Sequence, residues 1–341
     1  MLMKTLFRRR RSLLAGSALA VMLTVGLVAV APEFSSPASA QTGPSCADRV
    51  TSAPTGPATV SAALTPYGKV LVVGSGDYAG CSLYLLTSDQ LHALTGAPFA
   101  CSDNSNATGS PCDTVLWPAL LTKGAPIAGR GVNPTLLGTV TRTDLPGLRP
   151  VQQVTYAGLP LYRFFQDETP GETEGASLFD PVTSPTGIWY LVQPSRGRPA
   201  PGQAQLQLET APVGGTGPGQ TVLAATMNPD FSGFPQARFP VYTLSPDHHK
   251  SACQGVCAAV YWPPVLTSKR PLAGPGVDRH ALGIIVRPDG TRQVTYKGRP
   301  LYLFYNGAYI PGLPYNNGMA SINGAGAHTP WGVFNTIPPL P

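Results

Sequence analysis

Charged residues are scarce in this 341-residue chain, at 12% of the sequence, about half the share found in ordinary soluble domains. Stretches free of both proline and glycine are also short, since the chain contains 38 of each, and this leaves little room for long helices after residue 41. The apolar fraction of 43% is nevertheless too high for a disordered chain. The composition therefore predicts short β-strands joined by many turns.

Recognisable catalytic motifs are absent as well. None of the five histidines has the context of a nucleophile elbow or of another catalytic motif. The segment Gly74-Ser75-Gly76 is too short to form a phosphate-binding loop. We therefore expect no cofactor, and an enzyme is the less favoured interpretation.

The first forty residues have the pattern of an export signal. Lys4 and the run Arg8–Arg11 are followed by an apolar stretch over 13–31 and by Ala38-Ser39-Ala40, a small-residue cleavage site. We expect cleavage before Gln41. An uncleaved anchor helix is the alternative, because the apolar stretch approaches the ~18–20 residues that span a bilayer. The arginine run fits either the Sec or the twin-arginine export route.

Most of the positive charge belongs to this signal. The whole chain carries a formal charge of +6, and removal of residues 1–40 leaves about +2. Nucleic-acid binding needs a clustered basic face, and no such cluster is evident after residue 41. We therefore expect no nucleic-acid partner, and a membrane contact only through an uncleaved signal.

Six cysteines in an exported chain predict disulfide bonds. The short spacings favour Cys253 with Cys257, and Cys101 with Cys112 at the equivalent place. Cys46 then pairs with Cys81 by elimination.

The chain contains two copies of one module. Cys112 and Trp117-Pro118 recur 145 residues later as Cys257 and Trp262-Pro263, and the segment 153–162 recurs as 293–302. An ordered series of such matches indicates duplication. We expect an export signal at 1–40, a lead-in at 41–59, a first module at 60–193, a Pro/Gly-rich linker at 194–219 and a second module at 220–341. Trp189-Tyr190 and Trp331-Gly332 would close the two modules at matching places.

Each module is predicted to contain a hairpin and two strands centred on tyrosine. Ala157-Gly158 and Lys297-Gly298 are two-residue turns in which glycine supplies the positive φ of a type I′ turn. The four tyrosine strands suggest that each module is a pair of half-repeats. We therefore expect an all-β protein of two homologous antiparallel modules, each a small sandwich or barrel-like sheet. Closure of the four half-repeats into a four-bladed propeller is the alternative. The strand tyrosines are Tyr84, Tyr162, Tyr242 and Tyr302.

The order of these features resembles a bacterial secreted-repeat family, often described as predicted lipoproteins with a Tyr-x-(Phe/Trp/Tyr)-x-x-Asp motif. The resemblance covers most of residues 70–335. It implies an envelope or extracellular protein of unassigned activity.

This chain departs from the family motif in several places. Tyr162, Phe164 and Asp167 fit it fully, whereas Tyr302 and Phe304 are followed by Gly307 where Asp is expected. Cys46 follows Gly-Pro-Ser and not a lipobox, so we expect no lipid anchor. Leu replaces the aromatic residue after Tyr84 and Tyr242, although Asp89 and Asp247 are kept.

The motif aspartates are expected to be structural. Asp89, Asp167 and Asp247 stand where a strand ends, and a short carboxylate there can accept backbone N–H bonds from residues just ahead in an Asx-type turn. The Tyr-x-Phe face would meanwhile pack into the core.

Two other clusters could carry chemistry. His248 and His249 precede Cys253 and Cys257 and could bind zinc or copper if the thiols were free, but a disulfide is favoured. An acidic cluster beside Pro170-Gly171 could serve a glycosidase or bind Ca²⁺, but a solvated loop is favoured. This cluster comprises Asp167, Glu168, Glu172 and Glu174.

These observations favour a non-catalytic secreted or envelope repeat protein with a binding or structural role, its partner an envelope component or a glycan. One alternative is a carbohydrate-active hydrolase that uses Asp167 and Glu172. Another is a metal or redox accessory protein that uses His248 and His249.

Overall fold

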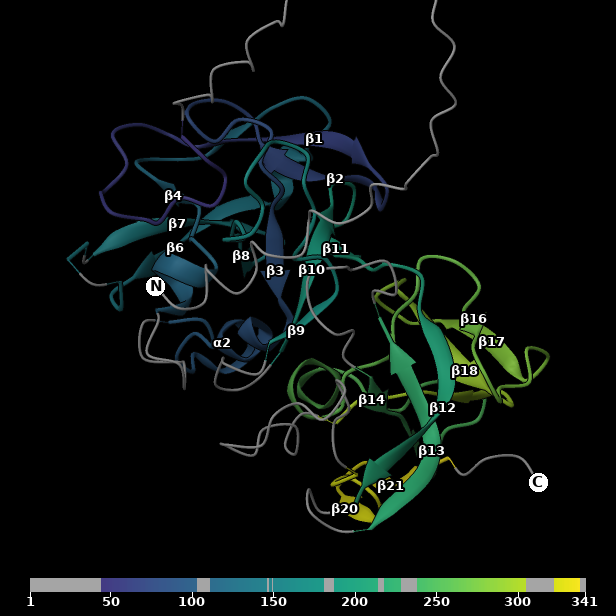
Figure 1. The fold of residues 1–341 in the computed structure, drawn as a ribbon. Coiled ribbons are helices and arrows are strands. Elements are labelled where there is room, and N and C mark those ends of the chain that lie inside the picture. The colour runs from purple at the N-terminus through teal and green to yellow at the C-terminus, as the bar shows by residue number, and fades with distance from the viewer. Residues whose placement is uncertain are drawn as a thin grey trace, which may run out of the picture. The chain divides into compact units, whose positions relative to one another are not determined.

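The structure is a computed structural model that describes residues 44–102, 111–145, 147–148, 150–180, 187–213, 218–227, 238–304 and 322–337 (Figure 1). The predicted export signal, its cleavage site and Gly307 lie outside these residues. Within them, no helix combines the length and the apolar character needed to cross a membrane.

Each module begins with a sheet of the same design. A long antiparallel hairpin carries a two-residue strand added parallel to its first strand, with Val60 opposite Ala128 in one module and Leu206 opposite Ala273 in the other. The elements are β1 (Thr59–Thr65), β2 (Gly68–Val73) and β5 (Ile127–Ala128), and then β12 (Gln205–Pro212), β13 (Gly219–Thr226) and β16 (Leu272–Ala273). A two-residue strand β14 (Phe239–Pro240) also pairs with β13.

The segment 194–219 therefore differs from the expected linker, because it contains β11 (Arg198–Ala200) and β12. The sequence Gln205-Leu-Gln-Leu-Glu-Thr alternates polar and apolar residues, which is the period of a half-buried strand. Leu206 is fully buried. Judged by its strands, the second module begins near residue 205.

A second sheet in each module contains the predicted hairpin. The turn residues Ala157 and Gly158 have φ of 51° and 83°, and Lys297 and Gly298 have 50° and 77°. Two consecutive positive φ values define a type I′ turn, so the sequence prediction is confirmed. The strands are β4 (Leu121–Thr122), β6 (Leu137–Arg142), β7 (Val151–Tyr156) and β8 (Leu159–Pro160) in the first module, and β17 (Leu282–Val286), β18 (Arg292–Tyr296) and β19 (Arg299–Pro300) in the second.

A third sheet in each module pairs a tyrosine strand with the strand that closes the module. Trp189 lies opposite Leu86 in one module, and Phe334 lies opposite Leu244 in the other. Phe334, and not Trp331 as the sequence suggested, therefore takes the place of Trp189. The strands are β3 (Tyr84–Leu86), β9 (Leu178–Asp180) and β10 (Gly187–Gln193), then β15 (Tyr242–Leu244), β20 (Ala327–Thr329) and β21 (Gly332–Thr336).

The core of each module is built on one tryptophan. Trp117 stacks on Trp189 with ring centroids 3.8 Å apart, and Trp262 stacks on Phe334 at 3.7 Å. Each tryptophan directly follows a single turn of π-helix, which spans Cys112–Leu116 in the first module and Cys257–Tyr261 in the second. A glycine in each module permits the close approach of the ring. An added Cβ on Gly175 would lie 2.7 Å from Trp117, and one on Gly324 would lie 2.6 Å from Trp262.

The fold is all-β, as predicted. The described residues form six small sheets of three or four strands and no closed barrel, and the helix α2 (Gln90–Thr95) is only six residues long. The half-repeats do not stand as four separate blades, because isolated antiparallel bridges join Tyr84 to Tyr162 and Tyr242 to Tyr302.

Three disulfides cross-link the chain, and they are the pairs expected: Cys46–Cys81, Cys101–Cys112 and Cys253–Cys257. The first fastens the lead-in to the first module. Arg163 adds to this attachment by donating to the carbonyl oxygens of Cys46 at 2.6 Å and Asp48 at 2.9 Å. Its guanidinium also lies 3.7 Å from the centre of the Tyr78 ring.

Candidate functional site

The two half-repeats of the first module exchange tyrosine–aspartate hydrogen bonds. Tyr84 donates its hydroxyl to Asp167 at 2.7 Å, and Tyr162 donates to Asp89 at 2.8 Å. The two tyrosines are also joined through their backbones, where each N–H donates to the other's carbonyl. Each half-repeat thus supplies the acceptor for the other's buried phenol.

The second oxygen of each aspartate accepts a backbone N–H. Asp89 accepts from Ala100 at 2.9 Å, and Asp167 accepts from Glu174 at 2.8 Å. These donors lie eleven and seven residues ahead, so the bonds close wider loops than the Asx turns expected from the sequence. All three motif aspartates are at most 1% exposed.

The second module keeps half of this exchange. Tyr302 donates to Asp247, whose other oxygen accepts from the backbone of Ala252 at 2.8 Å. The hydroxyl of Tyr242 instead accepts from the backbone N–H of Gly324 at 3.3 Å. This fits the replacement of the fourth motif aspartate by Gly307, although residue 307 lies outside the part that the structure describes.

Burial shifts the protonation of these groups. Desolvation raises the pKa of Asp167 to about 7 and raises the pKa of Asp89 and of Asp247, although the tyrosine hydrogen bonds oppose the shift. Desolvation, together with the adjacent aspartate, also raises the pKa of Tyr84 and Tyr162.

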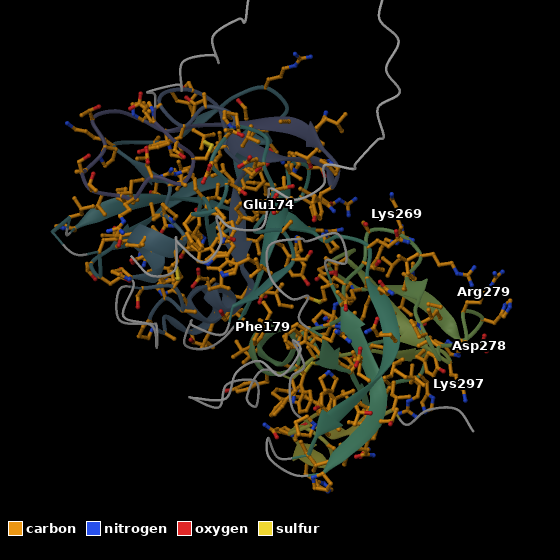
Figure 2. The ribbon with its side chains drawn as sticks, viewed as in Figure 1. Glu174, Phe179, Lys269, Asp278, Arg279 and Lys297 are labelled. Atoms are coloured by element: carbon orange, nitrogen blue, oxygen red, sulfur yellow. A yellow bond between two sulfur atoms is a disulfide. The ribbon has the colours of Figure 1, made fainter. Side chains whose placement is uncertain are left out.

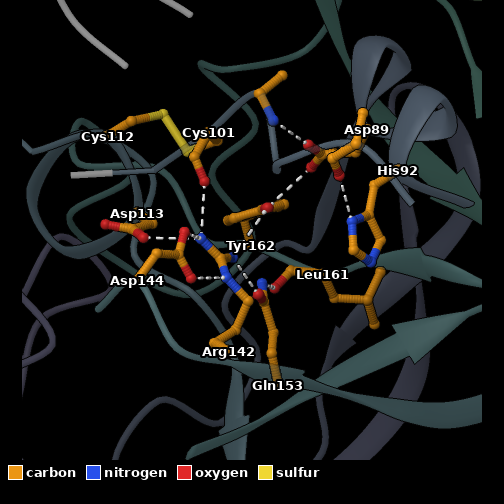
Figure 3. A network of polar contacts seen from close by, with 12 residues as sticks. Asp89, His92, Cys101, Cys112, Asp113, Arg142, Asp144, Gln153, Leu161 and Tyr162 are labelled. Carbon is orange, nitrogen blue, oxygen red and sulfur yellow. Dashed lines mark hydrogen bonds and ion pairs between the residues drawn. A yellow bond between two sulfur atoms is a disulfide. The ribbon is translucent and has the colours of Figure 1, made fainter. Parts of the chain in front are cut away.

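A buried arginine lies beside this exchange in the first module (Figure 3). Arg142 has no exposed side-chain surface and forms ion pairs with Asp113 at 2.7 Å and Asp144 at 2.6 Å. It also donates to the Gln153 side chain and to the carbonyl oxygen of Cys101. Burial opposes its charge, but Tyr162, Asp144 and Asp113 raise the pKa of Arg142 above its ordinary value.

Arg287 occupies the equivalent position in the second module with different partners. Its four hydrogen bonds go to neutral acceptors, on Ser251, Gln293, Cys253 and Gln254. Burial lowers the pKa of Arg287. Neither arginine was singled out from the sequence. The sequence did contain a signal. The two arginines are 145 residues apart, the offset of the repeat, and each follows the apolar residues of an equivalent strand, where a charged side chain interrupts the apolar sequence.

The predicted acidic cluster forms a hydrogen-bonded loop. Glu172 accepts from the backbone N–H groups of Glu168 at 2.6 Å and Thr169 at 3.1 Å. Glu174 contributes its backbone N–H to Asp167. Figure 2 labels Glu174 in the first module.

The predicted histidine–cysteine cluster does not form a metal site, because its cysteines are oxidised and buried while its histidines are exposed. Cys253 and Cys257 are joined in a disulfide and fully buried, so they offer no thiolate to a metal. His248 and His249 are exposed, and the His249 ring lies over Gly298. Within the described ranges, no group of three His, Cys, Asp or Glu side chains is arranged to hold a metal ion.

Comparison with known proteins gives one match. The model of a family described as a secreted repeat of unknown function matches residues 151–178 and 283–306. These two segments contain the predicted hairpins and the motifs at Tyr162 and Tyr302, which carried the resemblance seen in the sequence. The chain is thus similar to secreted repeat proteins, and its three disulfides agree with export. No curated protein and no solved structure matched the chain.

The raised pKa of Asp167 makes stability depend on pH. A carboxyl that binds its proton more tightly when folded stabilises the fold below its unfolded pKa of 3.8, and this stabilisation is lost as pH rises through about 7. At 1.36 kcal/mol per pKa unit, the contribution of Asp167 to the free energy of unfolding should fall by roughly 2–3 kcal/mol between pH 5 and 8.

Urea unfolding of the wild type and Asp167→Asn at both pH values measures this effect. We expect the variant to be less stable than the wild type by about 1 kcal/mol at pH 5, through the altered bond to Tyr84, and more stable than the wild type by roughly 1–2 kcal/mol at pH 8, because only the wild type loses the contribution of Asp167. Asp77→Asn, at an exposed position of the same module, should show no such change. If Asp167→Asn lowered the free energy of unfolding equally at both pH values, the raised pKa would not belong to Asp167.

Proposed function

We propose that the chain is a non-catalytic repeat protein of the cell envelope or extracellular space, with a binding or structural role. The observation that supports this proposal is the use of the motif carboxylates. Each of Asp89, Asp167 and Asp247 is buried, with one oxygen on a tyrosine hydroxyl and the other on a backbone N–H. Both oxygens of each aspartate are thus engaged within the fold, and each tyrosine bond joins parts of one module that lie far apart in the sequence.

A glycoside hydrolase remains the second candidate because of one observation. The pKa of Asp167, near 7, is in the range required of a general acid at neutral pH. Its proposed partner Glu172, however, is used to hold the backbone of its own loop.

Glycan binding and turnover, measured together on the oxidised protein, test the proposal. We expect an array of envelope glycans to show retention without release of reducing ends, or no glycan contact at all with capture of another envelope component. Asp167→Asn and Glu172→Gln are the informative variants, and Asp77→Asn is the control. Hydrolysis that is present in the wild type and control but lost in both variants would establish the enzyme instead.

A further inference from the structure

The two modules carry opposite net charges. The total of about +2 after residue 40 hides this division. Residues 60–193 contain six basic and ten acidic residues, a net charge of −4, whereas residues 220–341 contain nine basic and four acidic residues, a net charge of +5. An excess of positive charge on one module attracts partners of negative charge to that module.

Exposed basic residues of the second module lie next to one another although they are far apart in the sequence. The guanidinium of Arg270 donates to the carbonyl oxygen of Arg279 at 3.4 Å. The guanidinium of Arg292 donates at 3.1 Å to the carbonyl oxygen of Ser268, the residue before Lys269. Figure 2 shows Lys269 and Arg279 on the same side of the second module.

The same surface continues to the hairpin turn of this module. The backbone N–H of Lys297 donates to the carbonyl oxygen of Ala281, at the start of β17. The backbone N–H of His249 donates to the carbonyl oxygen of Gly298, which places Lys250 beside the turn. We call the six exposed residues that these contacts connect the basic surface, and they are Lys250, Lys269, Arg270, Arg279, Arg292 and Lys297.

The charge of the basic surface is not neutralised within the fold. The ion pairs formed among the described residues involve other arginines. The two exposed acidic residues of this module that the structure describes serve their own turns. Asp278 accepts from the backbone N–H of His280 at 2.8 Å, and Asp289 accepts from that of Thr291 at 2.8 Å.

The fold does not require these charges, because the first module has equivalent positions without them. Lys297 and Ala157 occupy the same turn position, with φ of 50° and 51°. Two other positions, Lys123 and Arg130, are basic in the first module only. At the repeat offset of 145 residues, or 140 after the insertion, five residues of the basic surface face uncharged counterparts, which are Gly124, Ala125, Pro134, Gln152 and Ala157.

We propose that the basic surface binds an anionic glycan, a polysaccharide whose carboxylate groups repeat along the chain. This inference rests on the binding role proposed above and names the class of its partner. The six cations are spread over a surface and are not gathered around one point, which suits a chain of repeated charges better than one small anion. Arginine also pairs with carboxylates through two parallel N–H bonds.

Two features favour a polysaccharide over other polyanions. Asp278 is exposed beside Arg279, and a continuous anionic lipid surface would repel it, whereas a flexible chain can place its charges on either side of this carboxylate. The match to secreted repeat proteins and the three disulfides agree with export. Export brings the basic surface to envelope glycans and away from intracellular nucleic acids.

Calorimetric titration of the full oxidised chain with polygalacturonate tests this surface. We expect saturable binding to the acid polymer and none to its fully methyl-esterified form, which keeps the sugar chain and lacks the charge. The affinity should fall at least about tenfold between roughly 50 and 200 mM sodium chloride, because salt screens exposed charges and binding releases counterions. Equal binding of the ester and the acid would overturn the proposal. So would tighter binding, per charge, to single-stranded DNA or to phosphatidylglycerol vesicles.

Paired substitutions separate the basic surface from the total charge. Lys269→Ala/Arg270→Ala removes two exposed cations of the surface, so we expect binding at least about tenfold weaker and an unchanged Tm. Lys123→Ala/Arg130→Ala removes the same charge from exposed positions of the first module and should bind as the wild type does. Equal weakening in the two double variants would assign the binding to total charge and contradict the basic surface.

Two further results distinguish this inference from the proposed function. Release of reducing ends from polygalacturonate by the wild type would contradict the non-catalytic role and keep the basic surface as the place where the polymer binds. Absence of binding to polygalacturonate, together with capture of a different envelope component, would overturn the anionic glycan and keep the binding role.

Discussion

Substitution of Arg142 by methionine is expected to lower the free energy of unfolding by roughly 3–5 kcal/mol, the range for breaking a buried ion pair from one side. The large effect arises because Asp113 has no exposed side-chain surface and would be left in the core without its ion-pair partner. The Gln153 side chain and the Cys101 carbonyl would lose their donor as well. Denaturant unfolding of the oxidised protein measures the loss.

The second module provides the matched control. Arg287→Met removes an arginine that contacts neutral acceptors only, so the loss should be smaller. The double variant Arg142→Met/Asp113→Ala removes the stranded carboxylate and introduces alanine, the residue that stands 145 positions later in the second module. It should be more stable than Arg142→Met alone. If Asp113→Ala made the arginine variant still less stable, the stranded carboxylate could not be the cause of the first loss.

Tyr162→Ala should be about as damaging, at roughly 3–5 kcal/mol, the usual cost of truncating a buried aromatic residue to alanine. The ring is fully buried and meets Trp189 edge-on, with centroids 5.0 Å apart. The same change also leaves Asp89 without its phenol donor.

Tyr162→Phe separates the ring from the hydroxyl. It keeps the contact with Trp189 and removes the bond to Asp89 together with the longer bond, 3.4 Å, that the hydroxyl accepts from Arg142, so the expected loss is about 1–3 kcal/mol. Tyr242→Phe is a suitable comparison, because the Tyr242 hydroxyl accepts a backbone N–H and has no aspartate in the described part of the chain. Equal losses for Tyr162→Phe and Tyr162→Ala would mean that packing contributes little at this position.

Local patterns in the sequence predicted the local structure well. The type I′ turns followed from Ala157-Gly158 and Lys297-Gly298, because few residue pairs accept two positive φ values. The pair Cys253–Cys257 followed from its short spacing. In each case the residues that decide the geometry lie within a few positions of one another.

Apart from the Cys46–Cys81 disulfide, which followed by elimination, contacts between distant residues were not predicted. Asp167 was expected to bond residues just ahead, yet it accepts from Tyr84, 83 residues earlier. A motif aspartate at a strand end has the same local sequence whether it turns the chain or binds a remote phenol. Only the pairing of Tyr84 with Tyr162 decides between the two, and strand pairing depends on the packed core. The ion pair of Arg142 with Asp113 was missed for the same reason, since Asp113 lies 29 residues away on a π-helical turn, whereas the other partner, Asp144, is only two residues away.

The attachment of the lead-in determines how the first module would respond to a mechanical load. A pull on the residues before Cys46 passes through the sulfur atoms to Cys81 and then directly into β3. The hairpin β1–β2 lies inside the covalent loop between these cysteines and carries none of the force. In the reduced protein the same pull would first load the hydrogen bonds of Arg163 to Cys46 and Asp48, and once these break it would enter at the start of β1 and peel this strand away from β2 one hydrogen bond at a time. The Cys46–Cys81 disulfide thus converts an easily unzipped terminus into one that resists tension.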